Sequence, residues 1–313
     1  MDKLKGIIKN RLKKVLQCLS SFIPYIIYCK IPKIKVVFRS LLSKDKKICN
    51  FGINISKDED CVILANGHSL VYSLQGGGGA LEFIKKNKKF CVNDSILSLK
   101  FWDLRPEYYV FMDPLYWARD VSEPYLSRHK QIAELLDKVN WPLRIFMPKD
   151  ASDWNFFIEL PVRNKNIEII YINIQPTKLS MDDKLRFVEY KYNYATPYVQ
   201  NVLAAVLYIA INIGFRNIYI FGADHDWTKY MDVSKDNILY VDNKHYFAEE
   251  KTYTPVLKDA TCTQYFTCAD YYKAMYLTFA AYYDIEEYSQ YINSKVYNAS
   301  KISFIDAFER IKI

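Results

Sequence analysis

From residue 55 onward, short apolar runs alternate with segments of helical periodicity, and this alternation limits the possible folds more than any other feature of the sequence. Near-continuous apolar strands connected by helices form mostly parallel sheets that are covered on both faces. We therefore expect residues 55–313 to form one Rossmann-like α/β domain. The expected strands are 61–65, 89–92, 108–112, 143–147, 167–173 and 217–221. The expected helices are 80–87, 124–139, 197–213, 269–284 and a short last one at 304–311.

Polar residues stand directly after four of the expected strands. They are Asn66, Gly67, His68 and Ser69 after the first strand, Asn93 after the second, Asp113 after the third, and Asp224, His225, Asp226 and Trp227 after 217–221. The carboxyl ends of parallel strands meet at one edge of a sheet, which is where open α/β sheets bind ligands. Asn and Ser supply neutral donors and acceptors that suit ribose and base edges, although Asn and Asp are also common turn formers.

The turn after the first expected strand has the features of an anion site. Gly67 allows the backbone to approach a ligand closely, and the free N–H groups at the start of the following helix favour negative charge. The alternative is an ordinary turn into a helix that Ser69 caps.

Residues 225–265 interrupt the alternation of strands and helices. This segment is long, polar and aromatic, and loops of that length in compact domains are usually lids or binding segments. It holds His225 and His245, two of the four histidines of the chain. A histidine with a pKa near neutrality can take the proton of an attacking hydroxyl, so either is a candidate general base. Asp224 and Asp226 form an Asp-x-Asp sequence of the kind that can bind a divalent metal.

Positive charge is concentrated in an N-terminal segment, which we place at residues 1–54. The chain has a net charge of +8, but residues 1–50 alone carry +11, so the remainder carries −3. Such a body is not expected to bind nucleic acid. The basic segment begins with apolar residues at helical spacing. That pattern predicts an amphipathic helix on an anionic membrane surface, although a solvated helix packed on the body has the same pattern.

The apolar part of this segment is too short to span a bilayer, and no cleavage site of a signal peptide follows it. The seven cysteines are scattered without a CxxC pair, so no zinc site is indicated, and Cys61 and Cys91 are expected in the core. The four glycines at 76–79 lack the Lys-Ser/Thr of a P-loop, and we expect a surface turn there. These features favour a cytoplasmic protein on the inner face of the cytoplasmic membrane.

A series of short motifs, read in chain order, carries a family resemblance. The motifs are Asn66-Gly67-His68-Ser69-Leu70, Val92-Asn93, Phe111-Met112-Asp113-Pro114, the helix 201–214 running into Ile218-Tyr219-Ile220-Phe221-Gly222-Ala223-Asp224, and His245-Tyr246. Over residues 60–310 the chain resembles the bacterial sialyltransferases of glycosyltransferase family 42. The wider group that looks similar includes the Maf-type flagellin glycosyltransferases and the MptE-like pyrophosphokinases. The resemblance implies a GT-A-like variant of the Rossmann-like sheet.

The resemblance also implies roles for residues at the strand ends. Asn66, Gly67 and Ser69 would hold the nucleotide of a CMP-sugar, and Asn93 would contact the same donor. Asp113 stands where the sialyltransferases have an Asn-Pro pair, and its added negative charge suits a hydroxyl of the donor rather than a carboxylate.

Further roles are implied for the long buried helix and the lid. Gln200 and Asn201 fall at the helix start with which the family contacts the donor. His245 falls on the family's general base and is followed by the same tyrosine, Tyr246. The counterpart of Asp224 in the family is structural rather than a metal ligand. The family's two phosphate-binding tyrosines have no clear counterpart, and the lid offers Trp227, Tyr230 and Tyr240 in their place.

The leading hypothesis is therefore an inverting glycosyltransferase that needs no metal or other cofactor. It would move an acidic sugar, a sialic-acid-like nonulosonic acid or Kdo, from a CMP-sugar donor to a surface glycan or lipid-linked acceptor. One alternative is an MptE-like pyrophosphokinase or nucleotide-transfer enzyme that uses the aspartates with magnesium. Another is an inactive membrane-docked module of a glycan-assembly complex. All three hypotheses imply the same fold, so only the residues and geometry of the site can distinguish between them.

Overall fold

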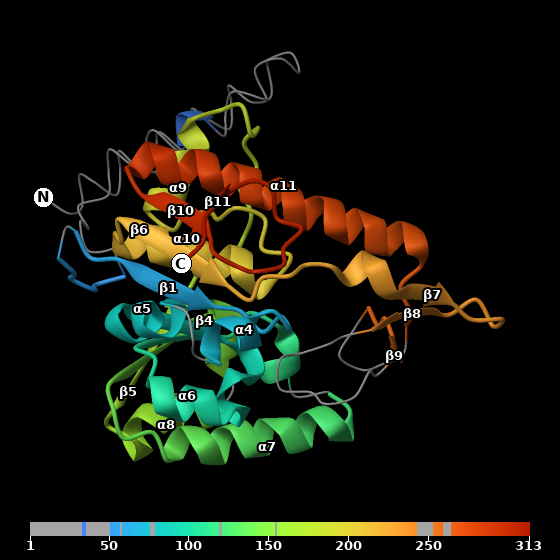
Figure 1. The fold of residues 1–313 in the computed structure, drawn as a ribbon, viewed down its shortest axis with the longest axis horizontal. Helices are drawn as coiled ribbons and strands as arrows, with labels where there is room; N and C mark the ends of the chain where they lie inside the picture. The colour runs from blue at the N-terminus through green and yellow to red at the C-terminus, as the bar shows by residue number, and fades with distance from the viewer. Residues whose placement is uncertain are drawn as a thin grey trace, which may run out of the picture.

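An eight-stranded sheet in which every pairing is parallel forms the centre of the molecule, in the order β11-β10-β6-β1-β2-β3-β4-β5 (Figure 1). The computed structural model describes residues 33–35, 51–56, 58–75, 79–118, 121–153, 155–242, 253–258 and 264–313. The strands are β1 (Cys61–Leu64), β2 (Lys88–Val92), β3 (Tyr108–Val110), β4 (Leu143–Pro148), β5 (Ile167–Ile172), β6 (Asn217–Phe221), β10 (Lys295–Asn298) and β11 (Glu309–Arg310). This confirms the Rossmann-like α/β fold, and six of the strands lie where the sequence predicts them.

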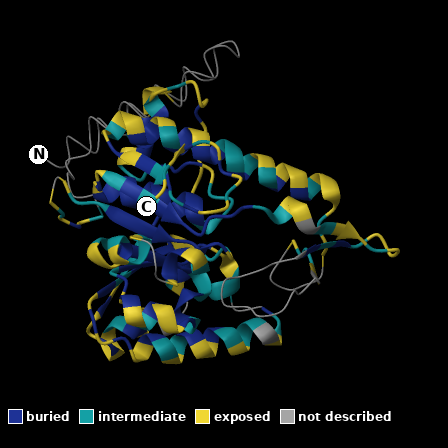
Figure 2. Cartoon of the chain, viewed as in Figure 1, coloured by how far each residue is buried: buried dark blue, intermediate teal, exposed yellow. Residues whose placement is uncertain are grey.

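β1 shows how the sequence produces a sheet that is buried on both faces. Cys61 and Ile63 belong to the hydrophobic cluster on one face, whereas Val62 and Leu64 belong to the cluster on the other. Side chains alternate between the faces of a strand, so a strand covered on both sides is apolar at every position. In Figure 2 the large sheet accordingly stands out as the buried centre of the molecule.

One face of the sheet is covered by α9 (Leu185–Lys191), α10 (Val202–Ile213) and α11 (Cys268–Ile292). α10 lies between the sheet and α11, and every residue from Leu203 to Ile213 is buried. Its sequence is apolar all round, as expected for a helix without a solvent-facing side. The helix ends at Gly214, whose φ of +104° is the left-handed conformation that favours glycine after a helix.

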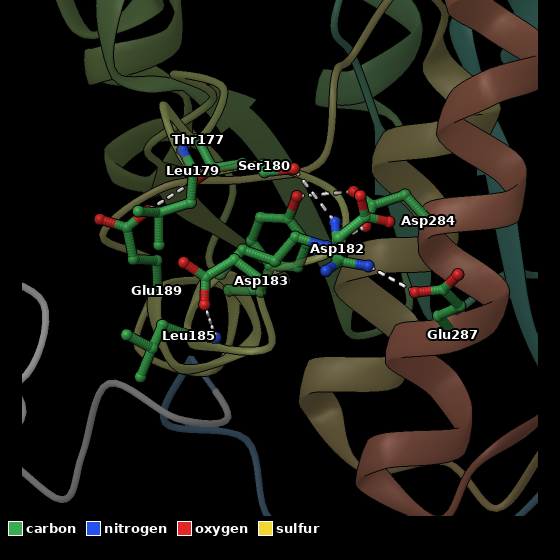
Figure 3. A network of polar contacts seen from close by, with 11 residues as sticks. Thr177, Leu179, Ser180, Asp182, Asp183, Leu185, Glu189, Asp284 and Glu287 are labelled. Carbon is green, nitrogen blue, oxygen red and sulfur yellow. Dashed lines mark hydrogen bonds and ion pairs between the residues drawn. The ribbon is translucent and has the colours of Figure 1, made fainter. Parts of the chain in front are cut away.

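A buried ionic network ties α9 to α11 (Figure 3). The Nε of Arg186 donates to Asp284 at 2.6 Å, and a terminal nitrogen of the same guanidinium donates to Glu287 at 2.5 Å. The hydroxyl of Tyr190 donates to the second carboxylate oxygen of Asp284 at 2.6 Å. Arg186 is only 1% exposed, so removing a partner would strand a buried charge. The network therefore fixes the rotation of α11, which also carries Tyr282.

The opposite face is covered by α4 (Leu70–Leu74), α5 (Ala80–Lys86), α6 (Leu99–Leu104), α7 (Glu123–Asp137) and α8 (Asn155–Arg163). Short 3-10 helices follow several strands: η2 (Asn93–Leu97), η3 (Pro114–Tyr116), η4 (Lys149–Asp153) and η5 (Trp227–Tyr230). The two sets of helices lie above and below the sheet in the view of Figure 1.

A second, antiparallel sheet occupies part of the expected lid. It consists of β7 (Met231–Val233), β8 (Leu239–Asp242) and β9 (Tyr253–Pro255). Leu239 and Val241 pack with Tyr271 of α11 in a hydrophobic cluster separate from the two at the large sheet. The described part of 225–265 is therefore built on the first turns of α11.

The expected helix at 304–311 is wrong. Residues 309–310 instead form β11, which pairs with β10. Before it, the Ser303 hydroxyl donates to the carbonyl of Ala223 at 2.6 Å, and the N–H of Phe304 donates to the carbonyl of Asp224 at 2.9 Å. The backbone here pairs with the end of β6 rather than with itself, which prevents a helix.

Other expected elements differ in extent. α10 begins only at Val202, and α11 continues to Ile292. α6, α8 and α9 have no counterpart among the expected helices. Most of the N-terminal segment 1–54 lies outside the described residues. Within the described part, Lys33 lies 2.7 Å from the carboxylate of Asp183, and no helix combines the length and apolarity needed to cross a bilayer.

Candidate functional site

A cavity of about 540 Å³ lies at the carboxyl ends of the central strands. The chain proceeds from β1 outward to β5 and then returns to β6 on the other side of β1, so the strand order reverses between β1 and β6. Such a reversal is where open α/β sheets bind ligands. The lining includes Asn66, Gly67, His68, Asn93, Asp113, Pro114, Gln200, Asn201, Val202, Leu203, Asp224, His225, Asp226, Trp227, Lys229 and Ile302. The structure thus brings most of the predicted site residues together.

Gly67 is needed because the ends of β1 and β6 touch there. Its N–H donates to the carbonyl of Gly222 at 2.8 Å, and a Cβ at Gly67 would lie 2.3 Å from that oxygen. Gly222 has a φ of +71°, and its own Cβ would lie 2.6 Å from the Cβ of Leu70. The contact between the strand ends therefore requires a glycine here, and since Gly67 also lines the cavity, its role in holding a nucleotide stays a prediction.

Ser69 lies beneath the cavity and is fully buried. Its N–H donates to one carboxylate oxygen of Asp224 at 2.8 Å, and its hydroxyl donates to the other. Burial raises the pKa of Asp224, and the hydrogen bonds from Ser69 oppose that rise. Ser69 is not among the residues that line the cavity, and we therefore assign it to holding Asp224 rather than to the nucleotide.

Asn66 and Asn93 lie where the ends of β1 and β2 meet. The amide of Asn66 donates to the carbonyl of Val92 at 3.2 Å and accepts the hydroxyl of Ser95 at 2.9 Å. Asn93 has a φ of +48°, a left-handed conformation that Asn adopts more readily than most residues. Its side-chain oxygen is buried without a hydrogen-bond partner in the described part of the chain. A buried acceptor without a partner is uncommon away from functional sites.

Asp113 and Asn201 both cap a helix at the cavity. The carboxylate of Asp113 accepts the N–H of Leu115 at 2.9 Å at the start of η3. The side-chain oxygen of Asn201 accepts the N–H of Ala204 at 3.1 Å and caps α10. Val202 belongs to the first turn of α10 and lines the cavity. The positive end of this twelve-residue helix therefore opens into the cavity.

His225 is held as a neutral ring. Its Nε2 lies 2.5 Å from the hydroxyl of Tyr282 and 3.2 Å from the amide nitrogen of Asn201. The amide oxygen of Asn201 is used by Ala204, so its NH2 group faces the imidazole. Nε2 therefore accepts, and the ring proton lies on Nδ1. Burial lowers the pKa of His225 to about 3.

These contacts do not support His225 as a general base. A base must offer a free lone pair, whereas the lone pair of Nε2 is engaged by Tyr282 and Asn201. The ring also packs on Trp227, with centroids 4.3 Å apart. We therefore describe His225 as a positioning residue of the cavity wall.

Other predicted residues lie outside the description or were missed by the sequence patterns. His245 and Tyr246 are not among the described residues, and Tyr230 ends η5 without a described side chain. Lys229 and His68 line the cavity, although neither was assigned a role from the sequence. Lys229 lies several residues after the end of the 217–221 strand. Because lysines are common in polar segments, the sequence did not indicate that this one faces the cavity.

No group of three or more His, Cys, Asp or Glu side chains among the described residues is arranged to hold a metal ion. Both oxygens of Asp224 are engaged by Ser69. Asp226 lies 3.7 Å from the ammonium of Lys229. The two residues of the Asp-x-Asp sequence thus have protein partners in this structure.

Comparison with known proteins gives no family assignment. No family model and no curated protein matches the chain. Among solved structures, the chain is similar to the Maf glycosyltransferase from Magnetospirillum magneticum AMB-1, with a TM-score of 0.44 and 13% identity. The match covers 83% of this chain and 35% of that chain, so the chain spans about a third of that protein's length. Function is therefore argued from the site.

Proposed function

We propose that the cavity binds a nucleotide-activated sugar and that the protein is a glycosyltransferase. The observation that carries this proposal is the convergence of neutral polar strand ends, a helix N-terminus and a lysine on one cavity at the reversal of strand order. The volume of about 540 Å³ lies within the range of small-molecule sites.

Three groups at the cavity can contact the phosphate of the donor. The N-terminus of α10 presents backbone N–H groups of its first turn, of which Asn201 caps that of Ala204, and such a helix start favours an anion. The ammonium of Lys229 and the exposed ring of His68 line the same cavity. These groups can stabilise a phosphate leaving group without a metal.

The nucleoside has neutral partners. Asn66, Asn93 and Gln200 line the cavity and carry amides that donate and accept. An amide can pair with the exocyclic amino group and the ring carbonyl of cytosine. We therefore propose a CMP-sugar as the donor, with an acidic eight- or nine-carbon sugar as its cargo.

In the proposed reaction, an acceptor hydroxyl oxygen attacks the anomeric carbon from the side opposite the phosphate. The bond between that carbon and the phosphate oxygen breaks, CMP leaves with the bonding electron pair, and the configuration inverts. The hydroxyl proton passes to a general base, and we propose His245 on the strength of the family resemblance. The acceptor would be a glycan or a lipid-linked saccharide.

The donor is tested by thermal unfolding of the full chain with CMP, UMP, GMP or ATP, each with and without magnesium. We expect CMP to raise the Tm most, and magnesium to add nothing, because a ligand that binds only the folded state stabilises it by mass action. A larger rise with ATP and magnesium would transfer the assignment to a pyrophosphokinase. No rise with any nucleotide would contradict the proposal and favour a non-catalytic module.

The phosphate contact is tested by Lys229→Ala in isothermal titration. Loss of one partly exposed charge is worth on the order of 1 kcal/mol, so we expect CMP to bind roughly fivefold more weakly and cytidine to bind unchanged. The matched control is Lys85→Ala, which removes an exposed lysine paired with Glu82 on α5. Equal CMP binding by both variants would exclude Lys229 from the phosphate site.

A further inference from the structure

Aromatic and positively charged side chains form an exposed rim at the mouth of the cavity. The rim residues are His68, Tyr72, Lys229, Lys301, Ile302 and Phe304. His68, Lys229 and Ile302 also line the cavity itself. The rim is therefore continuous with the proposed donor site.

The rim residues form aromatic–cation pairs. The ammonium of Lys301 lies 4.2 Å from the ring centroid of Tyr72, and the Tyr72 ring meets the His68 ring edge-on at 6.2 Å. The ammonium of Lys229 lies 5.0 Å from the centroid of Phe304. Lysine ammonium groups over aromatic faces keep their charge available to an incoming anion.

The segment that carries half of the rim is firmly anchored. The Ser303 hydroxyl donates to the carbonyl of Ala223 at 2.6 Å, and the guanidinium of Arg310 donates to the carbonyl of Ser303 at 3.0 Å. Ile302 and Phe304 nevertheless remain 38% and 44% exposed. Apolar side chains held at the surface beside a cavity mark a contact site for a ligand.

We propose that this rim is the acceptor subsite and that the acceptor is a saccharide carrying a carboxylate or phosphate. The inference rests on the proposed function, because an acceptor must reach the donor sugar through the mouth of the cavity. The apolar C–H face of a sugar ring packs on Tyr72 and Phe304, as aromatic side chains offer a rigid apolar surface. The ammonium group of Lys301 pairs with the negative group of the saccharide.

The test compares methyl β-D-glucuronide with methyl β-D-glucoside, which differ in one carboxylate. Saturation-transfer NMR is recorded on the full chain with saturating CMP. We expect the glucuronide to receive at least about fivefold more saturation than the glucoside, as one charge-assisted contact is worth about that factor. Lys301→Ala should remove this preference, and Tyr72→Ala or Phe304→Ala should weaken the signals of both sugars.

Two substitutions serve as matched controls. Lys85→Ala removes an exposed lysine near the end of α5, which leads into the amino end of β2, and Tyr276→Ala removes a tyrosine of α11 that is 71% exposed. Both should leave the glucuronide signal unchanged.

Equal saturation of the two glycosides by the wild type, or a preference for the glucuronide that survives Lys301→Ala, would overturn the proposal. The absence of any glucuronide signal would also overturn the proposal. If, in that case, Phe304→Ala lowered binding to phosphatidylcholine–phosphatidylglycerol vesicles, the rim would be a membrane contact instead. Stabilisation by CMP is measured on the same samples. It decides the donor site separately, so failure of the rim and failure of the proposed function can be told apart.

Discussion

Replacing His225 by Gln should make the stability of the protein less sensitive to acid. Glutamine does not titrate, and its amide oxygen can accept the hydroxyl of Tyr282 in place of Nε2. The substitution therefore removes the titrating group while keeping an acceptor for its neighbour. The wild type and the variant should differ in the slope of unfolding free energy against pH.

The size of the effect follows from the two pKa values of His225. Burial lowers the pKa to about 3 in the folded protein, whereas an unfolded histidine titrates near 6.5. Below pH 6.5 the unfolded chain binds a proton that the folded protein does not, so the unfolding free energy falls as the pH falls towards 3. Each pH unit in this window is worth about 1.4 kcal/mol. Between pH 8 and pH 5 the loss is therefore about 2 kcal/mol.

Urea unfolding at pH 5, 6, 7 and 8 measures the contribution of His225 to the pH dependence of the unfolding free energy. We expect the wild type to lose about 2 kcal/mol more than His225→Gln between pH 8 and pH 5. Leu99→Gln is the control, because it introduces the same amide at a position that is 83% exposed and removes no titrating group. If the stability of His225→Gln fell as much as that of the wild type when the pH is lowered, the conclusion that His225 is a buried, neutral ring would be refuted.

Two further substitutions test how the strand ends are joined. Gly67→Ala should lower the unfolding free energy by more than about 3 kcal/mol in urea, because the new Cβ would meet the carbonyl of Gly222, whereas Gly79→Ala, with open space around it, should change little. Ser69→Ala should cost about 1.5–3 kcal/mol, the worth of a hydrogen bond to a buried carboxylate, and thermal unfolding that matches the wild type would show that its hydroxyl does not support Asp224.

The sequence was sufficient to predict the six strands β1 to β6 because each of them carries its own signal. The run Val62 to Leu64 is apolar at every position, as expected for a strand covered on both faces. Asn66 and Asn93 could be placed at the cavity because each directly follows a predicted strand. The prediction of a helix at 304–311 was wrong because β11 forms by pairing with β10. A strand of two residues has no recognisable pattern in the local sequence.

The chemistry of individual site residues was harder to predict, because it depends on contacts between distant parts of the chain. Burial keeps His225 neutral, and its Nε2 contacts the hydroxyl of Tyr282 on α11, 57 positions later in the chain. Ser69 turns away from the cavity because Asp224 accepts both of its donors. Neither partner can be identified from the local sequence. The sequence alone therefore did not distinguish His225 from His245 as the general base.

The pairing of β1 with β6 also governs when the cavity can exist during synthesis. β1 lies between β2 and β6, and Cys61 pairs in register with Ile218. Until β6 has left the ribosome, one edge of β1 has no neighbour, and its apolar residues form an open edge that can pair with other chains. Contacts this distant in sequence also slow folding, since a long loop must close before they form. Overproduction of the protein should therefore depend on chaperone capacity more than its stability once folded would imply.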